Sequence, residues 1–354
     1  MRISDDADRR FESSRFADKQ VSAAQAPSPH APDDPAPPPA KPGSVEVWSR
    51  MTPKVDGLLA SATAKARMST VLPTTLSSAR ELGTTLVESG RLKAEEAMLV
   101  AEKQSETGLR FGETAIALGL IDVNDVEFAL AQQFDYPLLS PGEAVIAPEV
   151  VAAFAAQTEA VEQIRALRSK LILKWLREST NRRTIAVISA ESGAGRSFTV
   201  ANLAVAFAQL GASTLVIDAD LRRPRQHELF RLPNRIGLST LLAGLSGAES
   251  FVPVSYLPRL HLLPAGPTPP NPHDLLARPA MAHLLSKTAQ RYGVVLIDTP
   301  AWNEGNGATM LAAEAGAAVL LVRAGHSVTE MSVRVAQELT EHRATLLGVV
   351  INQN

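Results

Sequence analysis

The chain has 354 residues, of which 45% are hydrophobic and 20% charged, and its formal net charge is −2. This composition is ordinary for a globular domain, and the near-neutral charge gives no general attraction to nucleic acid, so we expect no nucleic-acid partner. The absence of cysteine excludes disulfides and thiol chemistry. The longest apolar stretch, residues 315–322, is far shorter than the roughly 20 residues of a membrane helix, so any work at a membrane would need a partner that holds the protein there.

Residues 1–75 are predicted to be a tail and linker. Eight of the 18 residues from 26 to 43 are proline, and such a composition cannot bury a core. We therefore expect a disordered spacer over residues 1–45, with a ligand for a proline-reading domain as the alternative. Within the following segment, 46–75, a helix is expected around residues 58–68.

Residues 76–150 contain an internal repeat. The segments 82–104 and 111–133 match at an offset of 29 residues, and each reads as a short helix, a glycine stop and a second helix. Gly90 and Gly119 fall where a helix ends, a place that favours glycine because it tolerates the left-handed backbone conformation. This region is predicted to be a small all-α domain.

Residues 151–180 are predicted to form one long helix, at 159–178. Strand-like and helical segments alternate after it, and continuous apolar strands separated by helices indicate a parallel sheet covered on both faces. We predict an α/β, doubly wound, mostly parallel P-loop domain at 181–354. Its expected strands are 184–189, 213–218, 260–263, 294–298, 317–322 and 347–351, and its expected helices are 198–210, 273–290, 309–315 and 327–340.

A glycine-containing loop joins the first of these strands to its helix, which is the setting of a phosphate-binding loop. Gly195 and Ser197 match that pattern, whereas Ala190 replaces its first glycine and Arg196 replaces its lysine. A strand-to-helix turn without a ligand is the alternative. The residues expected to contact the nucleotide are Ser192, Gly193, Ala194, Gly195, Arg196, Ser197 and Phe198.

Acidic residues end two further predicted strands. Asp218 and Asp220 follow one strand and Asp298 ends another, and the carboxyl ends of parallel strands share one edge of the sheet. Three acids beside one phosphate loop favour a nucleoside triphosphate site with Mg²⁺.

The second acidic motif continues into Arg222, Arg223 and Pro224 and resembles the Walker A′ motif of bacterial tyrosine kinases. Further segments resemble that family in the same order, at 237–239, 241–244, 263–266, 270–272, 275–276 and 297–300. The resemblance covers about residues 155–354. It is greatest to the cytoplasmic kinases of exopolysaccharide chain-length control, the EpsG-like and CapB/CpsD types.

This resemblance implies an ATP-dependent autokinase that forms a ring and acts with a membrane chain-length regulator, a Wzz-like co-polymerase. It implies a cytoplasmic location, peripheral to the inner membrane through that partner. The resemblance implies that Arg196 and the loop amides contact the phosphates, that Ser197 holds Mg²⁺ directly, and that Asp218 and Asp298 support Mg²⁺ and its waters. It also implies that Asp220 orients or deprotonates the tyrosine hydroxyl. Asn352, at the end of the last strand, is expected near the base.

Glu162, Arg165 and Arg168 match the family's oligomerisation motif. Their spacing of three residues places them on one face of a helix, although a solvated charged face is the alternative.

Three departures from the family pattern bear on two other functions. Arg196 binds phosphate but cannot mimic a compact ammonium, and the chain lacks the family's tail of tyrosines, so we expect no tail-based phosphorylation cycle. Both favour a catalytically weak, ATP-gated scaffold. Glu191 replaces the signature lysine of the partitioning ATPases (ParA and MinD types) and disfavours that third function.

The helical repeat resembles the N-terminal domain of type II secretion and pilus ATPases, some of which bind cyclic di-GMP. The corresponding residues here are Arg80, Gly83, Arg110 and Gly112, with Glu81 at the first arginine position. A docking or packing module without a ligand is the alternative.

Overall fold

The computed structural model describes residues 47–51, 76–134, 136–139, 145–154, 158–177 and 183–353. The proline-rich segment and the helix expected at 58–68 lie outside the described residues. Within the predicted linker, strand β1 (Val47–Met51) pairs in parallel with the last strand of the sheet. No helix in the described ranges has the length and apolar character that a bilayer crossing requires.

The predicted helical repeat is confirmed as four helices, α2 (Leu76–Glu88), α3 (Ala94–Thr107), α4 (Phe111–Ala117) and α5 (Val123–Gln133). Gly90 and Gly119 follow the first helix of each repeat with φ of 71° in both, as the glycine-stop prediction requires. Acidic residues at the third helical position reach back to the backbone N–H of the capping residue in three of these helices, which stabilises their starts. These residues are Glu96, Glu113 and Asp125.

Two other glycines of the repeat allow its helices to pack closely. A Cβ on Gly83 would lie 3.0 Å from the Phe111 ring, and one on Gly112 would lie 3.2 Å from the Val126 side chain. Phe111 and Val126 belong to a small buried core with Leu86 and other apolar residues of the unit. The glycines at these positions therefore serve the helix packing.

The described part of the nucleotide-domain sheet has eight strands in the order β1-β8-β7-β2-β6-β3-β5-β4. All neighbours are parallel except β4 and β5. The six predicted strands are confirmed within two residues at each end. The strands after β1 are β2 (Thr184–Ser189), β3 (Thr214–Asp218), β4 (Val252–Pro253), β5 (Leu260–Leu263), β6 (Val294–Asp298), β7 (Ala317–Arg323) and β8 (Thr345–Asn352).

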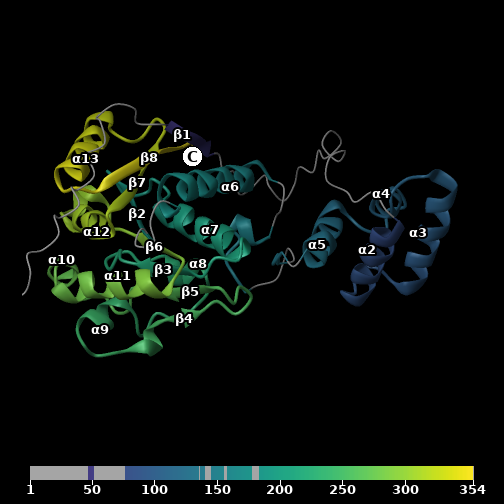
Figure 1. Ribbon diagram of the computed structural model, residues 1–354, viewed down its shortest axis with the longest axis horizontal. Helices are drawn as coiled ribbons and strands as arrows, with labels where there is room; N and C mark the ends of the chain where they lie inside the picture. The colour runs from purple at the N-terminus through teal and green to yellow at the C-terminus, as the bar shows by residue number, and fades with distance from the viewer. Residues whose placement is uncertain are drawn as a thin grey trace, which may run out of the picture. The chain divides into compact units, whose positions relative to one another are not determined.

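Helices cover both faces of this sheet, as the continuous apolar strands predict (Figure 1). Alternate residues of each strand enter one of two separate cores, so that in β2 Ile185 and Val187 face one helical layer and Ala186 and Ile188 the other. The first layer holds α6 (Glu159–Leu171) and α7 (Arg196–Gln209); the second holds α9 (Leu238–Leu242), α10 (Pro272–Leu276), α11 (Pro279–Arg291), α12 (Gly307–Ala315) and α13 (Thr329–Glu341).

Two predicted helices differ from the structure. The helix expected at 273–290 is divided into α10 and α11, because Pro279 begins a new helix and cannot continue the previous one. The helix expected at 159–178 is α-helical only to Leu171 and continues as a π-helical turn, Ile172–Leu176. The short strand β4 and the short helices α8 (Gln226–Leu229) and α9 were not predicted.

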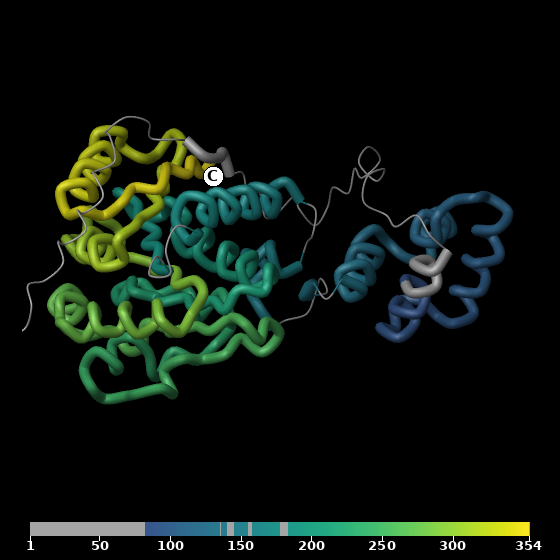
Figure 2. The backbone as a smooth tube through the Cα atoms, in the orientation of Figure 1, coloured from purple at the N-terminus to yellow at the C-terminus, as the bar shows by residue number. Residues whose placement is uncertain are grey.

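The helical unit also ends earlier than the predicted boundary at residue 150. Leu139, Ile146 and Val150 lie in the same core as the sheet and α7. Asn202 of α7 fixes this segment, since its side chain accepts from the N–H of Ala152 at 2.9 Å. The tube in Figure 2 shows the nucleotide domain running from the teal segments of this region to the yellow of β8.

Candidate functional site

The predicted phosphate loop joins β2 to α7 at the carboxyl edge of the sheet. Gly193 and Gly195 have φ of 80° and 95°, a conformation that other residues rarely adopt. Gly195 is the capping residue of α7, and the first-turn N–H groups of a 14-residue helix point toward the loop. Consecutive amides at a helix start can bind an anion, so the geometry is compatible with the predicted phosphate contacts, which stay a prediction.

Arg196 is 6% exposed and its guanidinium is surrounded by protein acceptors. Its Nε donates to the Thr299 carbonyl at 2.9 Å, and Nη1 donates to the Glu191 carbonyl at 2.9 Å and to the Ser189 hydroxyl. Its Nη2 lies 3.5 Å from Oδ2 of Asp220. Arg196 therefore cross-links the loop to the ends of neighbouring strands, a role that its planar, multi-donor group suits better than lysine would.

Asp218 and Asp298 are paired neighbours at the ends of β3 and β6, and both are 0% exposed. Oδ2 of Asp218 accepts the N–H of Arg225 at 3.1 Å, and the Ser197 side chain hydrogen-bonds to Asp298. Oδ1 of each carboxylate is buried without a hydrogen-bond partner among the described residues. The sequence prediction that these acids meet at one edge is confirmed.

Gln226 holds both carboxylates in place and was missed by sequence reasoning. Its backbone N–H donates to Oδ2 of Asp218 at 2.9 Å, and its side-chain Nε2 donates to Oδ2 of Asp298 at 2.8 Å and to the Ser197 carbonyl at 3.0 Å. A polar residue that follows the acidic motif is the only signal that could have indicated this role.

Burial dominates the protonation of this cluster. It raises the pKa of Asp218 well above its ordinary value, and the adjacent Asp298 raises it further. Burial also raises the pKa of Asp298, although Arg196 acts in the opposite direction. The pKa of Arg196 is lowered by burial, against the effect of Asp298 and Asp220. Three carboxylates facing one guanidinium form a site that favours an added cation.

The unpaired oxygens fit a hard divalent cation. Carboxylate and hydroxyl oxygens are the donors that Mg²⁺ prefers, and it usually binds one or two carboxylates and completes its shell with phosphate and water. No group of three or more His, Cys, Asp or Glu side chains in the described ranges forms a metal cage. Asp218, Asp298 and Ser197 could therefore supply oxygen ligands to such a cation, and their role as its ligands stays a prediction.

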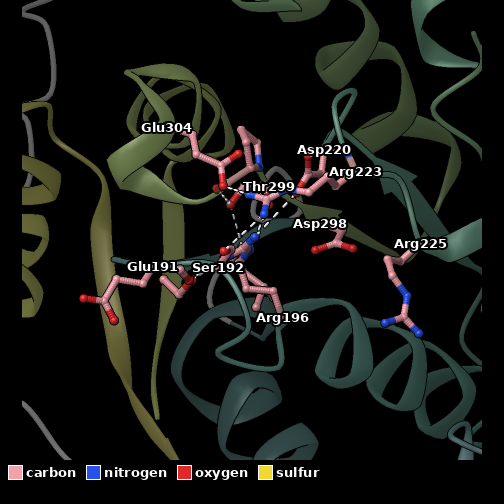
Figure 3. Close-up of polar contacts among 12 residues, drawn as sticks. Glu191, Ser192, Arg196, Asp220, Arg223, Arg225, Asp298, Thr299 and Glu304 are labelled. Atoms are coloured by element: carbon pink, nitrogen blue, oxygen red, sulfur yellow. Dashed lines mark hydrogen bonds and ion pairs between the residues drawn. The ribbon is translucent and has the colours of Figure 1, made fainter. Parts of the chain in front are cut away.

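A second ion pair lies at the outer side of the loop (Figure 3). Arg223, from the segment after β3, forms a salt bridge with Glu304 and donates to the Ser192 hydroxyl at 3.3 Å. The Arg223 N–H also donates to Oδ1 of Asp220 at 3.0 Å. In Figure 3 the Glu191 side chain points away from this cluster.

Comparisons with known proteins are consistent with this geometry. Residues 185–353 match the family model described as the CobQ/CobB/MinD/ParA nucleotide binding domain. The tyrosine-protein kinase YwqD of Bacillus subtilis (strain 168) is 35% identical over 191 residues, which cover 54% of this chain and 80% of that protein. The chain belongs to the bacterial tyrosine-protein kinases.

More distant kinases and solved structures agree. The tyrosine-protein kinase etk of Escherichia coli (strain K12) is 31% identical over 194 residues, covering 54% of this chain and 26% of that protein. The chimerical protein CapA2B2 superposes with a TM-score of 0.55 at 30% identity, covering 64% of this chain and 99% of that one. The kinase domain of Escherichia coli ETK gives 0.52 at 30%, covering 55% and 75%. The predicted family and P-loop fold are confirmed.

Two other predicted nucleotide contacts of this kinase have structural roles. The Asn352 side chain donates to the Ala194 carbonyl at 3.1 Å and thereby holds the end of β8 against the phosphate loop. Its contact with a base stays a prediction. The Phe198 side chain packs against Val151, Ala160 and Val161, which leaves its backbone N–H as the group available to a phosphate.

The predicted oligomerisation residues have partners within the chain. Arg165 pairs with Glu162 at 2.7 Å and donates to the Tyr136 hydroxyl at 2.8 Å. Arg168 donates to the Ala206 carbonyl at 2.8 Å. All three lie on α6, and self-association through them stays a prediction.

Among the cyclic di-GMP candidates, Gly83 and Gly112 have the packing role given above. Arg110 precedes α4, where its N–H donates to Glu113 at 3.0 Å. Arg80 belongs to α2, and its side chain lies outside the described part of the structure.

Proposed function

We propose that this kinase transfers the γ-phosphoryl group of ATP to tyrosine hydroxyls with Mg²⁺ as cofactor. The supporting observation is the pair of buried carboxylates, Asp218 and Asp298, each with an oxygen that lacks a partner among the described residues, beside the loop amides. Nothing in the apolar packing compensates such oxygens, whereas the cation of a bound nucleotide does.

Each residue of the site has a distinct role in this proposal. The loop amides and the start of α7 bind the phosphates, and Arg196 fixes the shape of the loop. Asp218, Asp298 and Ser197 hold Mg²⁺, which when bound neutralises charge on the phosphates. Asp220 orients the tyrosine hydroxyl and accepts its proton.

The cellular role follows from the family. We infer that the kinase acts in the control of exopolysaccharide chain length and export, with a membrane chain-length regulator as partner. It would be cytoplasmic and held at the inner membrane by that partner. Self-association would use Glu162, Arg165 and Arg168.

The experiment is phosphotyrosine detection after incubation of the purified chain with Mg²⁺ and ATP, with poly(Glu,Tyr) as an added substrate. Wild type is compared with Asp220→Ala and Asp218→Asn. The proposal expects labelling by wild type and its loss in both variants. Equal labelling in Asp220→Ala would contradict the role of that residue, and no labelling by any protein would contradict the kinase function.

The ion pair between Arg196 and Asp220 favours a second function, an ATP-gated scaffold. A guanidinium that holds the candidate base makes that base less available to a tyrosine hydroxyl. A scaffold would bind ATP with Mg²⁺ and change its self-association without phosphate transfer. Sedimentation of the chain with and without ATP, run beside the labelling experiment, distinguishes the two.

Cyclic di-GMP binding by the helical unit stays a prediction. Close packing accounts for Gly83 and Gly112 without a ligand, which favours the docking module. Titration of the full chain with cyclic di-GMP tests it, with Arg110→Ala as the variant. Heat that disappears in the variant would support binding.

A further inference from the structure

Tyr136 lies in the segment that leads from α5 into the nucleotide domain, and its hydroxyl makes two side-chain hydrogen bonds. The hydroxyl donates to Oε1 of Gln209 at 2.6 Å and accepts from Nη2 of Arg165 at 2.8 Å. The Arg165 guanidinium also lies over the Tyr136 ring, 5.4 Å from its centre. Tyr136 is half-buried. The Tyr136 hydroxyl therefore links Gln209, at the end of α7, to Arg165 of α6.

A second arginine completes this charged environment. Arg168 is half-buried, and its Nε–H is enclosed without a hydrogen-bond partner among the described residues. Burial lowers the pKa of Arg168, and the neighbouring Arg165 lowers it further, whereas Tyr136 acts in the opposite direction. The pKa of Arg165 is raised against burial, by its hydrogen bond to Tyr136 and by Glu162. Two neighbouring guanidiniums beside one hydroxyl form a site that a phosphate on that oxygen would stabilise.

The hydroxyls of the other two tyrosines lie in environments less suited to receive a phosphate. The hydroxyls of Tyr256 and Tyr292 are buried without a partner in the described part of the chain. Burial raises the pKa of both hydroxyls. Phosphorylation of either would require an enclosed hydroxyl to leave its present position.

We propose that Tyr136 is the tyrosine of this chain that accepts phosphate, and that Arg165 and Arg168 receive the phosphate. This inference rests on the proposed kinase function. In the step, the Tyr136 oxygen forms a bond to the γ-phosphorus of ATP. The bond from that phosphorus to the β–γ bridging oxygen breaks, and ADP leaves with the electron pair. The hydroxyl proton passes to the Asp220 carboxylate of the acting site.

The acting site belongs to a second copy of the chain. Gln209, which binds Tyr136, is the last residue of α7, whereas Arg196 of the phosphate loop is its first. A helix of 14 residues separates these ends by about 20 Å. In this docked position Tyr136 cannot reach the loop of its own chain, so the transfer takes place between copies.

Phosphorylation would also rearrange the predicted oligomerisation motif. Arg165 pairs with Glu162, whose side chain is 60% exposed. A phosphate carries more charge than a hydroxyl and competes with Glu162 for Arg165. Phosphorylated Tyr136 thereby couples the kinase reaction to the face that Glu162, Arg165 and Arg168 form.

The test maps phosphate by mass spectrometry after incubation of the full chain with Mg²⁺ and ATP. Phosphate is expected on Tyr136, and Tyr136→Phe is expected to lose most chain labelling while it still labels poly(Glu,Tyr). Tyr256→Phe and Tyr292→Phe are the matched controls and keep the Tyr136 label. Labelled peptide with no phosphate on Tyr136 overturns this inference alone. No label on chain or peptide overturns it together with the kinase function.

Two further measurements address the partner copy and the arginines. Asp220→Ala mixed with Tyr136→Phe is expected to gain phosphate on its Tyr136, and failure to gain it overturns transfer between copies. An added tyrosine phosphatase is expected to remove phosphate from Arg168→Ala on the order of tenfold faster than from wild type, because two guanidiniums shield the group in wild type. Equal rates in a folded variant overturn the role of Arg168.

Discussion

The helical unit and the nucleotide domain differ in whether packing explains the residues that stand out in their sequences. In the helical unit, Gly83 and Gly112 are explained by packing, since a Cβ would lie 3.0 Å from Phe111 and 3.2 Å from Val126. In the nucleotide domain, Asp218 and Asp298 are 0% exposed, and each has a buried oxygen with no hydrogen-bond partner in the described part of the chain.

This difference separates architecture from function. A close-packed glycine stabilises its own domain, whereas an uncompensated buried carboxylate costs several kcal/mol of folding free energy. Such a cost is consistent with selection for a ligand that pairs with the carboxylate. The nucleotide domain therefore carries the stronger indication of binding, although both regions contain residues that stand out in the sequence.

The largest expected effect is that of Asp218→Asn. Loss of a Mg²⁺ donor should lower phosphate transfer to poly(Glu,Tyr) by roughly 100- to 1,000-fold. The nucleotide-free variant should be more stable than wild type by about 1–2 kcal/mol, because a buried charge is removed. Steady-state labelling and urea unfolding measure the two effects. A variant that is both active and less stable would contradict the assignment.

The fold was largely predictable because its strands are mostly apolar, and two of them, β3 and β6, end in Asp218 and Asp298. Because parallel strands share their carboxyl edge, that pattern predicts Asp218 and Asp298 at one edge of the sheet. Pro279 shows where periodicity alone failed, since the apolar pattern continued across a residue that must begin a new helix.

The supporting contacts were not predictable. Gln226 binds Asp298, and Arg196 binds Thr299, each across a long stretch of sequence. Such pairs depend on the strand order, which local patterns do not specify. The contacts of Tyr136 with Arg165 and Gln209 likewise join residues far apart in the sequence.

The next largest effect concerns pH. Because burial raises the pKa of Asp218 and Asp298, the folded metal-free protein holds more protons than the unfolded chain above the ordinary aspartate pKa. Its free energy of unfolding should therefore fall as pH rises through the interval between the ordinary and the raised pKa. Denaturant unfolding in EDTA at several pH values measures this. Asp218→Asn should flatten the profile, and an equally steep profile in the variant would contradict the cause.

A smaller effect is expected in the helical unit. Gly112→Ala places a methyl group against Val126 and should destabilise that unit by about 1–3 kcal/mol. Hydrogen exchange of the α2–α5 amides should become faster, while ATP affinity stays unchanged. Ala101→Gly, at an exposed helical position, is a control that costs about 1 kcal/mol without crowding. A change in ATP affinity would break the distinction between the two regions.

The smallest effect is expected at the pair of Arg223 and Glu304. The Arg223 side chain is 55% exposed, and exposed ion pairs contribute about 0–1 kcal/mol to stability. A double-mutant cycle with Arg223→Ala and Glu304→Gln, followed by thermal unfolding, should give a coupling within that range. A coupling well above it would show that this pair stabilises the loop as Arg196 does.

The most direct test of the account is the affinity for ATP with and without Mg²⁺, measured by calorimetry on wild type and Asp298→Asn. We expect Mg²⁺ to strengthen ATP binding to wild type by at least about tenfold, because Asp218 and Asp298 complete the shell of the cation. The variant should lose that gain and keep its binding of ATP alone. Equal affinities with and without Mg²⁺ in wild type, or an undiminished gain in Asp298→Asn, would contradict the claim that these buried carboxylates hold the metal.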